Sequence, residues 1–106
     1  MNERSRKPPA RPAVHLRRLY VDCRFGQLHV RSAFPSSGGF DELTPLLCLH
    51  QSPMSSRAFR HFLGPMAADR SVFAPDTPGF GESDPPPSQP AIADYAGAML
   101  DFLEQM

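Results

Sequence analysis

The residues best suited to chemistry follow two short apolar runs. The run at 45–49 leads into His50-Gln51-Ser52-Pro53, and the run at 71–75 leads into a polar loop, Asp76-Thr77-Pro78-Gly79-Phe80-Gly81-Glu82-Ser83. Backbone N–H groups fixed in a loop like the first one can stabilise the oxyanion that forms on a carbonyl during acyl transfer. Pro78-Gly79 favours a tight turn, and Gly81 permits close backbone approach. The second loop therefore predicts an architectural role and not proton transfer.

Three other patterns offer weaker chemistry. Gly79-Phe80-Gly81 lacks the third glycine of a dinucleotide-binding fingerprint. Ser83 lies in Gly-Glu-Ser-Asp-Pro, which nearly imitates a Gly-x-Ser-x-Gly nucleophile elbow, but prolines follow it where a helix should start. Ser83 is therefore predicted to be a turn residue. The histidines and the two cysteines show no zinc-ligand spacing, so the sequence predicts neither a metal nor a cofactor.

Alternating and helical patterns predict the elements that position these loops. Residues 16–24 and 28–34 alternate as two strands of a hairpin, joined by a turn at Phe25-Gly26-Gln27. Residues 45–49 and 72–75 are apolar at consecutive positions, as in strands buried on both faces of a parallel sheet. Between them we expect a helix from about residue 57, capped by Ser55 or Ser56 and interrupted at Gly64-Pro65. Two strands separated by a helix indicate a right-handed crossover.

The last part of the chain predicts a proline-rich surface loop at 84–90 and an amphipathic helix at 91–105. The helix is expected to bury one apolar face, made of Ile92, Tyr95, Ala96, Met99, Leu100, Leu103 and Met106.

Length and charge limit the remaining possibilities. A chain of 106 residues forms one domain at most, and its formal net charge is zero. Residues 1–18 nevertheless carry six Arg and Lys residues against Glu3, without interleaved aromatic residues. We predict a disordered basic and proline-rich tail over residues 1–15, with neither a nucleic-acid nor a membrane partner. The apolar runs are too short to predict a membrane span or a signal peptide. Two cysteines, Cys23 and Cys48, do not predict a disulfide framework, and we expect a cytoplasmic location.

The order of these motifs resembles the N-terminal part of an α/β-hydrolase. The family places His-Gly-x-Pro after its third strand and Asp-x-Pro-Gly-x-Gly-x-Ser after its fourth. The resemblance covers residues 16–106 and implies an α/β fold: a partial hydrolase sheet made of an N-terminal hairpin and two parallel strands with crossover helices. It implies an oxyanion loop of His50, Gln51, Ser52 and Pro53, in which Ser52 N–H is the donor, Gln51 replaces the usual glycine and His50 is structural. It implies a structural glycine loop that contains Asp76, Pro78, Gly79, Gly81 and Ser83.

The resemblance also implies hydrolysis of a small ester, epoxide, halide or carbon–carbon substrate. The family's nucleophile elbow, acid and base histidine have no counterpart before Met106, so we expect no catalytic residues and an inactive isolated chain. A small-molecule substrate is expected only if the enzyme is completed. Two alternatives stay open: one half of a split enzyme completed by a partner chain, or a non-catalytic binding module. In the family's sheet order, the fourth strand lies between the second and the third. Strand 45–49 would therefore be an exposed edge that invites self-association or a partner chain and leaves the isolated chain marginally stable.

Overall fold

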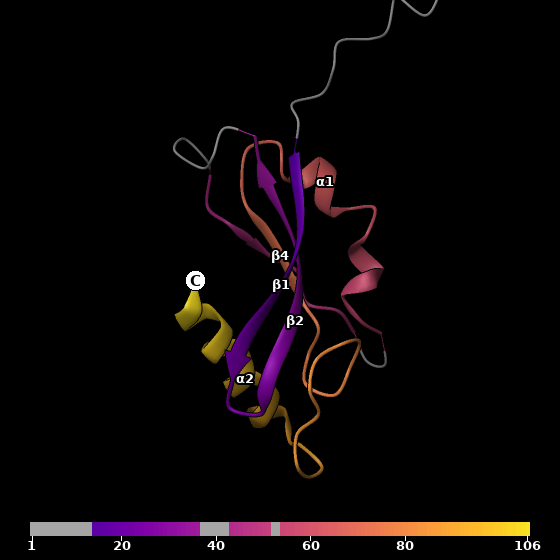
Figure 1. The fold of residues 1–106 in the computed structure, drawn as a ribbon, viewed down its shortest axis with the longest axis vertical. Coiled ribbons are helices and arrows are strands. Elements are labelled where there is room, and N and C mark those ends of the chain that lie inside the picture. The colour runs from indigo at the N-terminus through magenta and orange to yellow at the C-terminus, as the bar shows by residue number, and fades with distance from the viewer. Residues whose placement is uncertain (1–13, 37–42, 52–53) are drawn as a thin grey trace, which may run out of the picture.

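A four-stranded mixed sheet with helices on both faces forms the centre of the protein (Figure 1). The computed structural model describes residues 14–36, 43–51 and 54–106. The strand order is β1-β2-β4-β3, so β4 is inserted between β2 and β3. The α/β class and the predicted hydrolase-like sheet order are therefore confirmed. Residues 1–13 of the predicted tail lie outside the described residues, whereas Val14 and His15 already belong to β1.

The hairpin is the longest regular unit. Strand β1 (Val14–Cys23) pairs antiparallel with β2 (Gly26–Pro35) over its whole length, from Val14 opposite Pro35 to Cys23 opposite Gly26. The connecting turn consists of residues 24 and 25, so the predicted turn at Phe25-Gly26-Gln27 is wrong by one residue. Gly26 instead opens β2 with a φ of 120°, a conformation that residues with a Cβ rarely adopt.

The two apolar runs form the predicted parallel pair. Strand β3 (Leu46–Leu47) pairs with β4 (Val72–Pro75), and backbone bonds from Leu46 N to Ser71 O (2.9 Å) and Cys48 N to Phe73 O (2.8 Å) extend the ladder. All four residues of β4 are buried because strands flank it on both sides. Burial on both faces is wrong for 45–49, where only Cys48 is buried, because β3 lies at the sheet edge.

The segment after β3 forms two short helices in place of one. Ser55 caps the first as predicted, since its hydroxyl accepts a hydrogen bond from Arg57 N (3.2 Å), but this helix is a 3-10 turn, η2 (Ser56–Phe59). Helix α1 (Leu63–Met66) follows. The break between the two helices therefore lies before Gly64-Pro65, where the sequence predicted an interruption. Pro65 lies in the first turn of α1, where a missing N–H leaves no hydrogen bond unmade.

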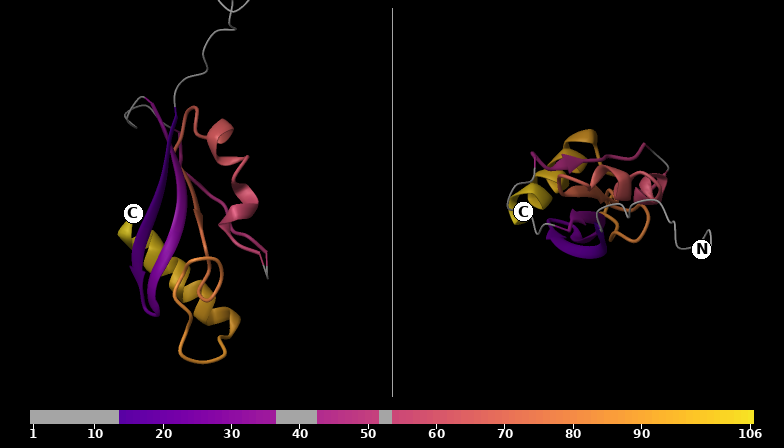
Figure 2. Two further views of the ribbon diagram at one scale, coloured as in Figure 1. Left: turned by 45° about the vertical axis from the view of Figure 1, so that its right-hand side comes forward. Right: turned by 90° about the horizontal axis from the view of Figure 1, so that it is seen from above.

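Two clusters of buried side chains cover opposite faces of the sheet. The ribbon shows α2 on one side of the sheet and the short helices on the other (Figure 2). One lies beneath α2 (Ile92–Gln105) and contains Leu28, Val30, Phe73, Ala98, Met99 and Phe102. The other lies beneath η2 and α1 and contains Ala33, Cys48, Leu63, Ala67, Val72 and Ala74. Neighbouring residues of β2 thus serve different layers, as the alternation of side chains along a strand requires.

The predicted helix at 91–105 is present, but its predicted buried face is largely wrong. Of that face Met99 is buried, whereas Ile92, Leu100, Leu103 and Met106 are exposed. The sheet contacts Ala98 and Phe102 instead, and Phe102 meets Phe73 edge to face. At the hairpin turn, a bidentate ion pair between Arg24 and Asp101 accompanies this rotation. Hydrogen bonds from Arg24 lower the pKa of Asp101 below its ordinary value.

Candidate oxyanion-loop site

His50 joins the loop after β3 to the loop after β4. Its Nε2 accepts a hydrogen bond from Thr77 N (3.0 Å), and Thr77 Oγ1 lies 3.2 Å from the same atom. Because Nε2 is the acceptor, the proton belongs on Nδ1, which then donates to Gln51 O (3.1 Å). The ring also packs edge-on against Phe80. The imidazole lone pair is therefore occupied by backbone and is unavailable as a general base in this arrangement.

The rest of the predicted oxyanion loop is only partly described. Gln51 is exposed, and its side-chain amide donates to Met54 Sδ (3.5 Å). Ser52 and Pro53 lie outside the described residues, and with them the predicted N–H donor. What the structure brings together is therefore His50 and Gln51 from the end of β3 with Thr77 from the end of β4.

Asp76 is the buried centre of the second loop. Its side chain is 1% exposed, and three donors reach its carboxylate. Oδ1 accepts from Ser56 N (2.6 Å), while Oδ2 accepts from His29 Nδ1 (2.8 Å) and Glu82 N (3.0 Å). Burial alone would raise the pKa of Asp76, but the hydrogen bonds from Ser56, Glu82 and His29 outweigh it and lower the pKa below its ordinary value. The buried group is thus an ionised carboxylate that holds β2, η2 and the glycine loop together.

Ser83 closes the same arrangement from the other side. Its hydroxyl donates to Asp76 O (2.7 Å) and accepts from His29 N (2.8 Å), and Asp76 N donates to His29 O (2.8 Å). The hydroxyl is buried and has both a donor and an acceptor partner in backbone. Ser83 therefore extends the pairing of β2 and β4 beyond the strand end, which gives this serine a structural contact and no adjacent base.

Two glycines of the loop have backbone conformations that other residues rarely adopt. Gly79 has a φ of 83° and Gly81 a φ of 53°. A Cβ at Gly81 would also collide with the Asp76 carboxylate. Pro78 between them and β4 is fully buried. The Pro-Gly-x-Gly spacing thus lets the chain wrap closely around the buried carboxylate.

Sequence reasoning missed His29 as a member of this site. The pairing of Val30 with Pro75 in β2 and β4 brings His29 to Asp76 across 47 residues of sequence. His29 is 1% exposed, and its Nε2 lies 3.6 Å from Glu82 Oε2. The available signal was a histidine between two apolar residues, Leu28 and Val30, together with an aspartate directly after a buried strand, which needs donors.

The described residues contain few groups suited to nucleophilic or metal chemistry. Burial raises the pKa of the Cys48 thiol, so this residue stays protonated beneath α1. Over residues 14–36, 43–51 and 54–106, no three His, Cys, Asp or Glu side chains are grouped so that they could hold a metal ion. Within the same ranges, none of the helices has the length and apolarity that a membrane crossing needs.

The fold is that of the α/β-hydrolases, and comparison with known proteins agrees. A family model for the alpha/beta hydrolase fold matches residues 44–106, and the chain belongs to this family. A candidate hydrolase from Bacillus subtilis shares 28% sequence identity with a TM-score of 0.71, over 86% of this chain and 31% of its own.

Two further solved structures share the fold. The haloalkane dehalogenase DatA from Agrobacterium tumefaciens C58 is 19% identical with a TM-score of 0.69, over 84% of this chain and 28% of its own. The epoxide hydrolase CorEH is 21% identical with a TM-score of 0.65, over 88% of this chain and 30% of its own. The chain thus spans less than a third of each of these proteins.

Proposed function

We propose that this chain forms the oxyanion-loop and glycine-loop portion of a hydrolase that acts on a small ester, epoxide, halide or carbon–carbon substrate. The observation that carries the proposal is the hydrogen bond from Thr77 N to His50 Nε2, which fixes the loop after β3 against the loop after β4. A rigid backbone in this position is what stabilisation of a developing oxyanion requires. Family membership and the names of the structural neighbours supply the range of substrates.

We further propose that the 106-residue chain alone has no more than residual activity. The sequence contains no Gly-x-Ser-x-Gly elbow, and the hydroxyl of Ser83 is already bonded to backbone. A nucleophile without an adjacent base is weak at neutral pH. An oxyanion site and binding contacts without the attacking groups support only slow turnover.

The open edge of β3 favours two further candidates. One is a split enzyme completed by another chain, and the other is a binding module without catalysis. Leu46 N and Cys48 N point to β4, so alternation directs the N–H groups of Leu47 and Leu49 to the unpaired side. Leu49 is 53% exposed. Among the described residues no strand pairs with this side of β3, and an apolar edge of this kind is suited to accept a strand from a second copy or from a partner chain.

Hydrolysis assays on the purified full chain test these proposals. We expect no release of nitrophenolate from p-nitrophenyl acetate, of bromide from 1-bromobutane or of diol from styrene oxide above the buffer rate. Adding a partner captured from the source cell should restore turnover if the enzyme is split, and Leu49→Lys should reduce both capture and turnover. Robust turnover by the chain alone, lost in Ser83→Ala, would contradict the proposed inactivity. Activity with a partner that Leu49→Lys leaves unchanged would contradict docking at the β3 edge.

A further inference from the structure

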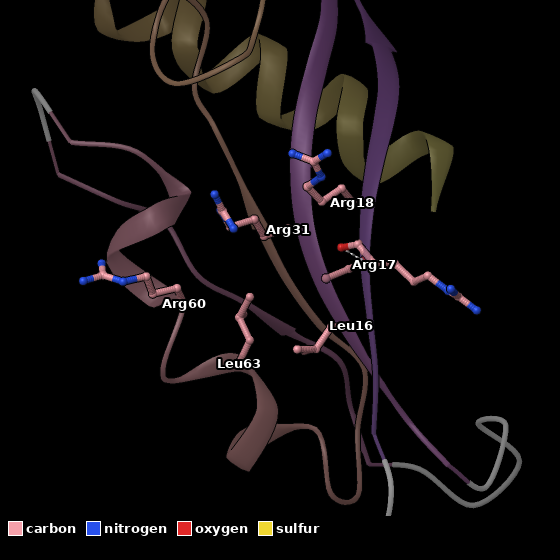
Figure 3. A pocket seen from close by; sticks show the side chains of 7 residues that line it. Leu16, Arg17, Arg18, Arg31, Arg60 and Leu63 are labelled. Carbon is pink, nitrogen blue, oxygen red and sulfur yellow. Dashed lines mark hydrogen bonds between the residues drawn. The ribbon is translucent and has the colours of Figure 1, made fainter.

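A second polar site lies on the face of the hairpin that η2 and α1 cover. It is a pocket of about 470 Å³ between β1, β2 and the two short helices, lined by Leu16, Arg17, Arg18, Arg31, Ser32, Arg60 and Leu63 (Figure 3). None of these residues belongs to the loops at 50–53 and 76–83. The pocket is therefore separate from the candidate oxyanion-loop site.

Two arginines stand directly opposite each other in this pocket. The register of the hairpin pairs Arg18 with Arg31, and residues opposite each other in an antiparallel pair project on the same face. Like charges in this position destabilise a sheet. The nearest carboxylate is that of exposed Glu82, whose Oε2 lies 3.9 Å from Arg18 Nη1. Among the described residues, no carboxylate forms an ion pair with Arg31, and its buried Nε has no hydrogen-bond partner. The hairpin thus carries a concentration of positive charge that the described residues leave largely uncompensated.

The remaining lining residues give the pocket an apolar end. Arg60 adds no charge to it, because its guanidinium points away from Arg18 and Arg31, and its Nη1 donates to Arg57 O (3.0 Å) (Figure 3). Leu16 and Leu63 approach each other at the apolar end, and Leu16 is 61% exposed (Figure 3). An exposed leucine beside a pocket gives an apolar group of a ligand a surface to cover.

Arg17 provides an internal contrast. It neighbours Arg18 on β1, but its side chain projects to the other face of the hairpin and points away from the pocket (Figure 3). It contributes only backbone to the wall, since its carbonyl accepts a hydrogen bond from Ser32 Oγ (3.0 Å). Arg17 therefore adds a positive charge close in sequence without adding one to the site.

We propose that this pocket binds a small amphiphilic anion: a carboxylate or phosphate monoester attached to a short aliphatic chain. Its oxygens are held between the guanidinium groups of Arg18 and Arg31, which supply the forked donors that match carboxylate and phosphate. Its aliphatic part lies against Leu16 and Leu63. The pocket volume falls in the range of small-ligand sites, about 300–1,000 Å³. Binding removes the repulsion across the hairpin, so the ligand stabilises the fold.

Titration calorimetry on the full chain with hexanoate, hexyl phosphate, acetate and hexanol tests the proposal. We expect both six-carbon anions to bind, acetate to bind at least fivefold more weakly than hexanoate, and hexanol not to bind. Arg18→Gln and Arg31→Gln should weaken hexanoate binding at least tenfold, because each removes one of the two forks. The matched control Arg17→Gln removes the same charge from the opposite face and should change the affinity less than twofold.

Unfolding in urea separates ligand binding from a structural role. Without ligand and at low salt, Arg31→Gln should unfold at the same or a higher urea concentration than the wild type, because a like-charge pair is gone. An unfolding midpoint that drops together with binding would overturn the proposal, since Arg31 would then serve the fold. Equal loss in Arg17→Gln would indicate a non-specific basic surface, and equal affinity for acetate and hexanoate would remove the apolar subsite.

Discussion

Replacing Asp76 by asparagine tests whether a buried carboxylate organises the loops at the ends of the strands. The amide keeps the size of the side chain but presents NH2 in place of one oxygen. Oδ1 faces Ser56 N and Oδ2 faces Glu82 N, so one of these two backbone donors meets the NH2 group whichever way the amide is turned. An orphaned buried donor costs about 1–3 kcal/mol, and the surviving bonds each lose about 1 kcal/mol of charge assistance. We therefore expect Asp76→Asn to lower the free energy of unfolding by about 3–5 kcal/mol.

The same carboxylate predicts the acid limb of the stability curve. The pKa of Asp76 is lower in the folded state than the value of about 3.9 of an unfolded aspartate. Its contribution is thus fully present above about pH 4 and is lost as the pH falls through the folded pKa. Wild-type stability should decline over this acid range, and Asp76→Asn should remove that part of the decline.

Urea titrations followed by far-ultraviolet circular dichroism at several pH values measure both effects. A domain of this length has a total stability of about 5–15 kcal/mol, so the variant should lose a large share of it and unfold at a clearly lower urea concentration. The control is Asp69→Asn, an aspartate whose side chain is 62% exposed, which should change stability little. A stability within about 1 kcal/mol of the wild type and an unchanged acid limb for Asp76→Asn would refute the reasoning.

Three further predictions follow from other parts of the structure. In urea titrations, Gly81→Ala should destabilise the protein by about 2 kcal/mol or more, because Gly81 has a positive φ and a Cβ there would collide with the buried carboxylate. The control Gly64→Ala in α1 should be neutral or stabilising by about 0.5–1 kcal/mol. Equal effects of the two substitutions would contradict this account. Leu49→Lys should reduce self-association in analytical ultracentrifugation more than the equally exposed control Leu100→Lys, and an equal reduction would argue against the β3 edge. Asp101→Asn should lower the urea midpoint less in high salt than in low salt, since its exposed ion pair is screened; a salt-independent change would point to packing.

Much of the local structure could be predicted because it depends on neighbouring residues. Ser55 caps the helix after β3, Val72–Pro75 is a buried strand, and Pro78 with Gly79 and Gly81 makes the loop around the end of β4. In each case the signal is a side chain or a backbone preference that acts within a few residues. The family's loop pattern also allowed the position of β4 between β2 and β3 to be foreseen.

The buried face of α2 and the partner of Asp76 were decided by tertiary structure. Helical spacing offered Leu100 and Leu103 for burial as readily as Ala98 and Phe102, and only the position of the sheet selected the latter. His29 meets Asp76 because β2 and β4 are neighbours in the sheet, a relation that spacing along the chain does not encode. Local sequence determined where the elements and their polar ends lie, whereas long-range packing determined which side chains those ends bring into contact.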